Sequence, residues 1–127
     1  MIVLDSSAWL EFFGDGRYAD EFAARLKQPT NILTPTVVIY EVYKWIKRER
    51  SEEEAVHAIA TMRKTRVVDL SEEIALTAAD LSLAHKLPMA DAFVLATARS
   101  QGAQLLTTDS DFAAIDSVTV YPKKRSK

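Results

Sequence analysis

The chain has 127 residues and a mass of 14.2 kDa, which fits one domain with its own hydrophobic core. Hydrophobic residues make up 48% and charged residues 27%, a composition that excludes disordered, fibrous and collagen-like classes. Cysteine is absent, so disulfides, thiolate metal sites and cysteine nucleophiles are excluded too. No apolar run approaches the ~20 residues of a membrane span, and the N-terminus lacks a signal peptide's basic start. We therefore predict a soluble, cytoplasmic protein without a membrane partner.

The small net charge of −2 hides an uneven distribution. All 18 acids but only 12 of the 16 bases lie within residues 1–122, which carry a net charge of −6. The other four bases crowd the last five residues, so we divide the chain into a domain, residues 1–122, and a basic tail, residues 123–127. An acidic domain lacks the clustered positive face of a DNA-coating protein, and some of its acids are expected to share a cation.

Short β-branched runs alternate with longer helical patterns, which predicts βαβ units and a parallel sheet. The predicted strands cover Ile2–Asp5, Asn31–Thr34, Arg66–Leu70, Gln104–Thr107 and Val118–Tyr121. The predicted helices cover Ser6–Phe13, Tyr18–Gln28, Pro35–Arg50, Ser51–Lys64, Ser71–Lys86 and Ala90–Gln101. The expected fold is a single α/β domain, a doubly wound parallel sheet of four to five strands with helices on both faces.

Three helix starts have recognisable capping residues. Ser51 and Glu54 have the spacing of a capping box, and Ser71 is expected to cap the helix that follows it. Thr34 is expected to cap the helix that Pro35 begins. The glutamates directly after Ser51 are then explained by the helix dipole rather than by a functional site.

Several catalytic classes lack their residues. Only three glycines occur, at positions 14, 16 and 102, which excludes a phosphate-binding P-loop and a dinucleotide fingerprint. The two histidines, His57 and His85, stand isolated in helical patterns, so neither a Ser–His–Asp arrangement nor a histidine-rich metal motif is indicated. Carboxylate chemistry is what remains.

Four acids stand where a shared site would place them. Asp5 ends the first predicted strand and Asp109 follows the fourth, and in parallel sheets the carboxyl ends of strands form binding crevices. Glu41 and Asp91 interrupt apolar helix faces, which is costly for a carboxylate unless it is paired or metal-bound. Carboxylates without histidine or cysteine predict a hard cation, Mg²⁺ or Mn²⁺, and such sites usually act on phosphates.

Each of these acids also has a simpler structural explanation. Asp5 and Asp109 suit helix N-caps, and Asp91 suits a first helical turn near the dipole. Glu41 suits a solvated ion pair with Lys44, three residues on. Taken singly, the two interpretations are balanced, and the four acids together favour a site.

The same residues match a known family. The segments Met89–Ala98, Gly102–Ala103 and Leu105–Phe112 strongly resemble PIN-domain ribonucleases, most closely the VapC-type toxins of toxin–antitoxin pairs. Val3–Ala8 and Tyr40–Val42 fit the same pattern. The resemblance covers most of the chain, and its C-terminal half is the specific part.

The resemblance implies an endoribonuclease that uses Mg²⁺ or Mn²⁺ to cleave single-stranded or loop RNA. It implies that four acids are catalytic and bind the metal: Asp5, Glu41, Asp91 and Asp109. It also implies accessory roles for the hydroxyls of Ser7 and Thr107, and Asp111 is a further accessory candidate because it lies two residues beyond Asp109. Toxins of this family typically form homodimers and are inhibited by a cognate antitoxin.

Two surfaces are expected to contact partners. The apolar residues of the first helix cannot all face one core, so some are expected to meet a second copy or an antitoxin: Trp9, Leu10, Phe12 and Phe13. The bases on the helix of Glu41 are expected to contact RNA: Lys44, Lys47, Arg48 and Arg50. The basic tail, residues 123–127, is a second candidate for RNA contact, or simply a solvated terminus.

Two other functions compete with a nuclease. In a phosphoacceptor receiver domain, Asp5 would bind Mg²⁺ and Asp69 would be phosphorylated. Serines stand where that family needs a second acid beside Asp5, and Glu41 and Asp91 would have no role. An inactive PIN-like binding module is the other alternative, and the presence of all four acids argues against it.

Overall fold

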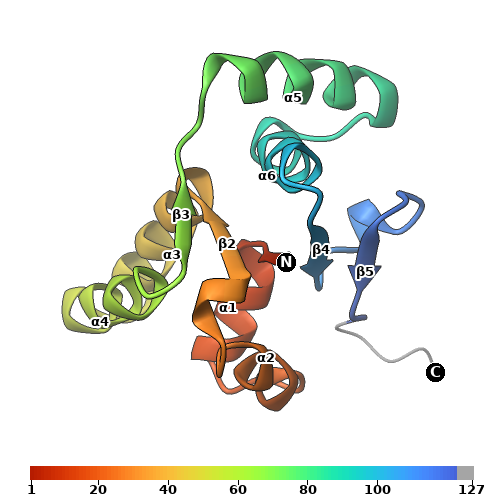
Figure 1. The fold of residues 1–127 in the computed structure, drawn as a ribbon. Coiled ribbons are helices and arrows are strands. Elements are labelled where there is room, and N and C mark those ends of the chain that lie inside the picture. The colour runs from red at the N-terminus through yellow and green to blue at the C-terminus, as the bar shows by residue number, and fades with distance from the viewer. Residues whose placement is uncertain (123–127) are drawn as a thin grey trace.

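The computed structural model describes residues 1–122, in which five strands form one sheet and six α-helices surround it (Figure 1). The strands are β1 (Ile2–Leu4), β2 (Ile32–Pro35), β3 (Arg66–Val68), β4 (Gln104–Thr107) and β5 (Val118–Val120). The α-helices are α1 (Ser6–Phe13), α2 (Ala19–Arg25), α3 (Thr36–Glu49), α4 (Glu52–Met62), α5 (Glu72–His85) and α6 (Met89–Ser100). Two short 3₁₀ helices are η1 (Pro29–Asn31) and η2 (Ser110–Phe112). The basic tail lies outside the described residues.

All strand pairs are parallel, and the strand order is β3-β2-β1-β4-β5. β1 is central, with Val3 opposite Leu33 of β2 and Leu105 of β4. The chain extends the sheet from β1 to β3 and then crosses back to β4 and β5 on the other side. This reversal makes the boundary between β1 and β4 the topological switch point, where open α/β sheets bind their ligands.

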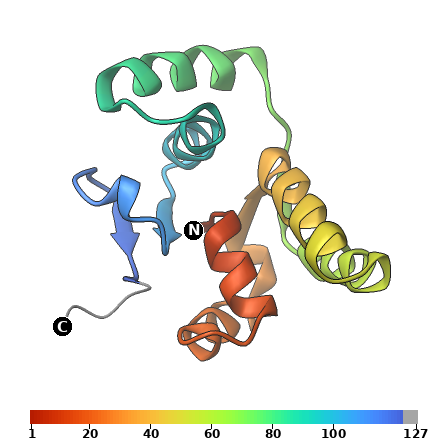
Figure 2. The same ribbon diagram turned by 180° about the vertical axis from the view of Figure 1, so that it is seen from behind.

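The helices divide into two groups, α5 with α6 and α1 with α2, α3 and α4, as Figures 1 and 2 show, and α6 meets the second group at α3. α1 packs on β1, β4 and α3, while α3 packs on β2 and α4. α6 packs on α5 and reaches β1, β2 and β4. Right-handed crossovers on the two sides of a switch point place their helices on opposite faces of the sheet. The doubly wound α/β fold expected from the sequence is therefore confirmed, with five strands.

The core lies between the central strands and the helices that cover them. Its largest fully buried side chains include Trp9, Phe22 and Phe112. Among the described helices, none combines the length and the apolar character that crossing a bilayer requires.

The aromatic residues of α1 are split between core and surface. Trp9 is 0% exposed, and its ring stacks on Phe13 with 5.7 Å between centroids. Of the four apolar residues expected to divide between core and partner, Trp9 belongs to the core. Leu10, Phe12 and Phe13 are only partly buried, so they retain surface for a partner.

The helix caps at Ser51 and Ser71 are confirmed. The Ser51 hydroxyl accepts a hydrogen bond from the Glu54 amide at 3.0 Å, and Ser71 accepts one from the Ile74 amide at 3.1 Å. The expected cap at Thr34 is wrong, because β2 continues through Pro35 and leaves Thr34 inside the strand. The Thr34 hydroxyl lies 2.6 Å from that of Thr65, so it joins the β2 region to the segment before β3.

Candidate active site

Asp5 stands at the carboxyl end of β1 and is only 4% exposed. Its Oδ1 accepts hydrogen bonds from the Ala8 amide at 3.0 Å and from the Ser7 hydroxyl at 2.7 Å. Its Oδ2 accepts a hydrogen bond from the Thr107 hydroxyl at the end of β4. Asp5 therefore caps α1 and also bridges the two strands that flank the switch point, so the capping explanation and a place in the site are compatible.

The hydroxyls of Ser7 and Thr107 continue this network into the loop after β4. Their oxygens lie 3.2 Å apart. Ser7 Oγ accepts a hydrogen bond from the Thr108 amide at 3.0 Å, and Thr107 Oγ1 accepts one from the Asp109 amide at 2.9 Å. The two hydroxyls thus fix the Asp5 carboxylate and the start of the loop that carries Asp109.

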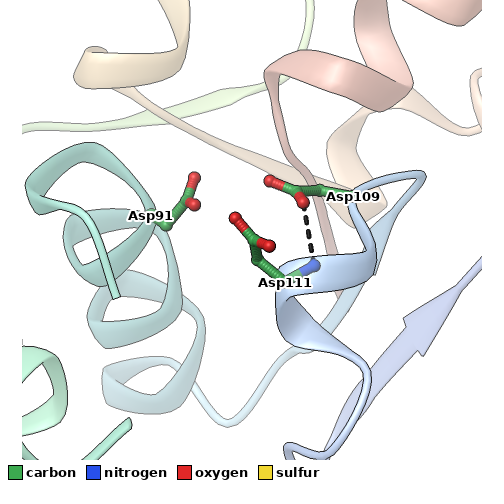
Figure 3. A group of neighbouring side chains, drawn as sticks. All are labelled: Asp91, Asp109 and Asp111. Atoms are coloured by element: carbon green, nitrogen blue, oxygen red, sulfur yellow. Dashed lines mark hydrogen bonds between the residues drawn. The ribbon is translucent and has the colours of Figure 1, made fainter. Parts of the chain in front are cut away.

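Asp91, Asp109 and Asp111 form a cluster of carboxylates at this end of the sheet (Figure 3). Asp91 comes from the first turn of α6, and the other two follow β4. One carboxylate oxygen of each residue lies within 4.8 Å of the others. Asp109 also caps η2, since its Oδ1 accepts a hydrogen bond from the Asp111 amide at 2.9 Å. Such a set of oxygen donors suits a hard divalent cation.

Burial raises the pKa of Asp5 to about 6. The hydrogen bonds from Thr107, Ser7 and the Ala8 amide lower the pKa, and the negative charge of Asp109 raises it. Burial outweighs these hydrogen bonds because removing a carboxylate from water disfavours its charged form.

Burial also raises the pKa of Asp91, to about 7, with further increases from the charges of Asp109, Asp5, Glu41 and Asp111. These four contributions place Asp91 within electrostatic reach of every acid in the site. Asp91, Asp109 and Asp111 form the carboxylate cluster itself, while Asp5 and Glu41 act on Asp91 through their charges.

Glu41 lies on α3, and burial raises its pKa. A hydrogen bond from the Ser6 side chain and the positive charge of Lys44 act in the opposite direction. Sequence reasoning missed the contact with Ser6, which joins the start of α1 to α3. The only signal was a pair of serines after Asp5, and serines at that position also serve as ordinary helix caps.

The bases expected to contact RNA separate into two pairs. Lys44 and Arg48 line a surface pocket that also includes Glu41. Lys47 and Arg50, by contrast, pair with acids of α4: Lys47 Nζ lies 3.9 Å from Glu52 Oε1, and Arg50 Nε lies 2.9 Å from Glu54 Oε1. Arg48 is paired as well, since its Nε lies 2.8 Å from Glu49 Oε2, so Lys44 and Arg48 differ from the other two bases in lining the pocket of Glu41 and not in lacking a partner.

A comparison with protein families identifies the fold. The model of the PIN domain family matches residues 2–118. The chain belongs to the PIN domain family. No curated protein sequence matches this PIN domain.

Solved structures of similar fold include bacterial toxins. A toxin–antitoxin complex from Klebsiella pneumoniae matches 94% of this PIN domain and 97% of its own chain, with 24% identity and a TM-score of 0.79. VapC20 from Mycobacterium tuberculosis is described as a sarcin-ricin loop cleaving toxin. The match covers 91% of this chain and 95% of VapC20, with 24% identity and a TM-score of 0.74. The match to DNA-bound VapBC from Salmonella typhimurium covers 94% of this chain and 96% of the other, with 16% identity and a TM-score of 0.73. At these identities the likeness shows a shared fold.

The charges of the site predict how pH affects the metal-free PIN domain. The pKa of Asp91 rises from 3.8 to about 7 on folding, so the folded state holds its proton more tightly than the unfolded state. Its contribution to stability is therefore complete below about pH 4 and is lost as the pH rises through about 7. Asp91→Asn should raise the free energy of unfolding at about pH 8 by about 1–2 kcal/mol, allowing for solvent screening.

Urea unfolding in the presence of a chelator measures this effect. The gain from Asp91→Asn should shrink as the pH falls from about 7 toward about 4. Asp80→Asn removes an exposed acid from α5 and controls for the change in net charge. An Asp91→Asn protein that unfolds more easily than the wild type at about pH 8 would contradict the electrostatic strain described above.

Proposed function

We propose that this PIN domain is a Mg²⁺- or Mn²⁺-dependent endoribonuclease that cleaves single-stranded or loop RNA in the cytoplasm, as the toxin of a toxin–antitoxin pair. Membership of the PIN family supports nuclease activity. The observation that carries the proposal is the carboxylate cluster of Asp91, Asp109 and Asp111 beside Asp5, at the switch point of the sheet.

The chemistry of the acids fits a divalent cation. All candidate ligands are oxygens; burial raises the pKa values of Asp5 and Asp91, neighbouring acids raise that of Asp91 further, and a bound cation would offset both effects. We assign metal binding to four acids: Asp5, Glu41, Asp91 and Asp109. Asp111 is an accessory ligand. A divalent cation bound by such residues activates water and stabilises charge on a leaving phosphate oxygen.

Other residues of the chain prepare the site. The Ser7 and Thr107 hydroxyls hold the Asp5 carboxylate in one orientation, so it does not need to reorganise during the reaction. In the metal-free protein the pKa of Asp91 is raised to about 7, so a bound cation would displace a proton from this carboxyl group near neutral pH. Lys44, Lys47 and Arg48 are exposed on α3 and supply positive charge for RNA phosphates on an acidic domain.

An apolar groove between α1, α3 and α4 supports the partner proposal. Its volume is about 340 Å³, and its lining includes Leu10, Phe13, Trp45, Ile46 and His57. We propose a homodimer in which this α1 region receives, or lies beside, a segment of a cognate antitoxin. Similar folds occur in solved toxin–antitoxin complexes, which is consistent with such a partner.

The receiver-like alternative loses support from the strand order. Asp69 follows the edge strand β3, which is separated from β1 by β2, so Asp69 and Asp5 do not end neighbouring strands. An inactive PIN-like module remains the alternative that an activity assay must exclude.

Cleavage of a panel of labelled RNAs tests the proposed activity. Asp5→Asn and Asp91→Asn should each lower the cleavage rate by about 100-fold or more, because each removes a carboxylate on which metal binding depends. Chelator should abolish cleavage by the wild type, and Asp80→Asn should retain it. Metal-dependent cleavage at the wild-type rate by both folded variants would refute the assignment.

Paired substitutions on α1 test the partner proposal. Phe13→Ala should weaken dimerisation or antitoxin binding and leave RNA cleavage intact, because Phe13 lines the groove and is only partly buried. Trp9→Ala should instead lower the free energy of unfolding by about 3–5 kcal/mol, as expected for a core aromatic. Sedimentation and antitoxin capture measure the first effect, and urea unfolding measures the second. Unchanged assembly in a folded Phe13→Ala protein would place the partner elsewhere.

A further inference from the structure

Two aromatic residues are exposed on α3 beside the acidic site. Tyr40 is 60% exposed and Trp45 is 39% exposed. Both line a surface pocket of about 240 Å³ together with Glu41, Lys44 and Arg48. Trp45 also lines the groove proposed above for a protein partner, whereas Tyr40 does not, so the exposure of Tyr40 beside the acids has no other explanation on this helix.

We propose that this pocket binds one base of a single-stranded RNA, with Tyr40 and Trp45 contacting the base and Lys44 and Arg48 contacting its flanking phosphates. The proposal rests on the proposed function and adds a base-binding subsite to it. Aromatic faces beside positive charges are the combination that binds single strands with little sequence preference.

The pocket has the size and the charge that this ligand requires. Its volume of about 240 Å³ is below the ~300–1,000 Å³ of pockets for drug-sized ligands, which suits one base rather than a larger cofactor. Lys44 Nζ lies 5.3 Å from the centroid of the Tyr40 ring and 3.3 Å from its hydroxyl. The Lys44 ammonium group therefore lies next to the Tyr40 ring, where it could contact the phosphate of a nucleotide whose base stacks on that ring.

Glu41 connects the pocket to the acidic cluster. It lines the pocket, and its charge also acts on Asp91. A base held by Tyr40 and Trp45 would thus direct the adjoining part of its strand toward the acids. A single strand can turn one base out into this pocket. Base-paired RNA cannot, because its bases are stacked inside the helix, so the pocket would favour single-stranded RNA.

A second tyrosine–lysine pair, three residues further along α3, serves as a control. Lys47 Nζ lies 5.4 Å from the centroid of the Tyr43 ring and 3.4 Å from its hydroxyl, which repeats the geometry of Lys44 and Tyr40. Neither Tyr43 nor Lys47 lines the pocket. Tyr43→Leu therefore removes an aromatic–cation contact outside the pocket, and because Tyr43 is partly buried against the core, urea unfolding must show that this variant is folded.

Tryptophan fluorescence reports base binding directly. The chain has two tryptophans, and Trp9 is buried, so quenching on addition of RNA reports Trp45. The probes are single-stranded hexaribonucleotides and an abasic ribose-phosphate strand of equal length and charge, in chelator to prevent cleavage. Base-containing strands should quench the fluorescence and the abasic strand should not. In anisotropy titrations, Tyr40→Leu and Trp45→Leu should each weaken binding of base-containing strands by about 5- to 100-fold, and Tyr43→Leu by less than about twofold.

Equal affinity for abasic and base-containing strands would overturn the proposal, as would equal losses in the Tyr40→Leu and Tyr43→Leu proteins. Loss of antitoxin capture with unchanged RNA affinity in the Tyr40→Leu and Trp45→Leu proteins would also overturn it and assign the pocket to a protein partner. The result is independent of the proposed nuclease activity. Base-specific binding without cleavage would refute the nuclease alone, and cleavage without base-specific binding would refute the subsite alone.

Discussion

The hydrogen bonds of the Asp5 carboxylate are the contacts on which the rest of the site depends. One oxygen caps α1 through Ala8 and accepts from Ser7, and the other accepts from Thr107 at the end of β4. The loop that carries Asp109 is attached to the same hydroxyls. A single buried carboxylate therefore joins the central strand, the first helix and the loop after β4. This arrangement fixes the crevice at the switch point before any ligand enters.

The same arrangement opposes stability, because it gathers negative charge at a partly buried site where water screens it less than at the open surface. Burial and neighbouring acids raise the pKa of Asp91 to about 7, and burial raises that of Asp5 to about 6. A domain selected only for folding would gain by replacing such groups with neutral ones. This cost is consistent with the proposed metal site, because a divalent cation is the ligand that their oxygens suit.

Much of the fold and the position of the acids could be predicted from the sequence. Strand and helix periodicity located the five strands and six α-helices of the described residues but neither 3₁₀ helix, and Asp5 and Asp109 follow strands that proved to be neighbours. The expectations that failed depended on contacts between parts of the chain that are distant in sequence. Thr34 has the sequence of a helix cap, but strand pairing extends β2 past it. Trp9 was one of four apolar residues on the first helix that could not all face the core, yet it is completely buried. Contacts between distant segments, such as Ser6 with Glu41, leave no local pattern to recognise.

Counting the protons released when a divalent cation binds tests the central claim, that these acids form one metal site. Titration calorimetry with Mg²⁺ or Mn²⁺, repeated in buffers of different ionisation enthalpy, gives this number. Because the pKa values are about 6 for Asp5 and about 7 for Asp91, both carboxyls hold part of a proton at about pH 6.5 that the cation must displace. We expect proton release at about pH 6.5 that falls toward zero at about pH 8.5 and is reduced in Asp91→Asn. Absence of metal binding, or binding without proton release at either pH, would contradict the assignment of a metal site to these acids.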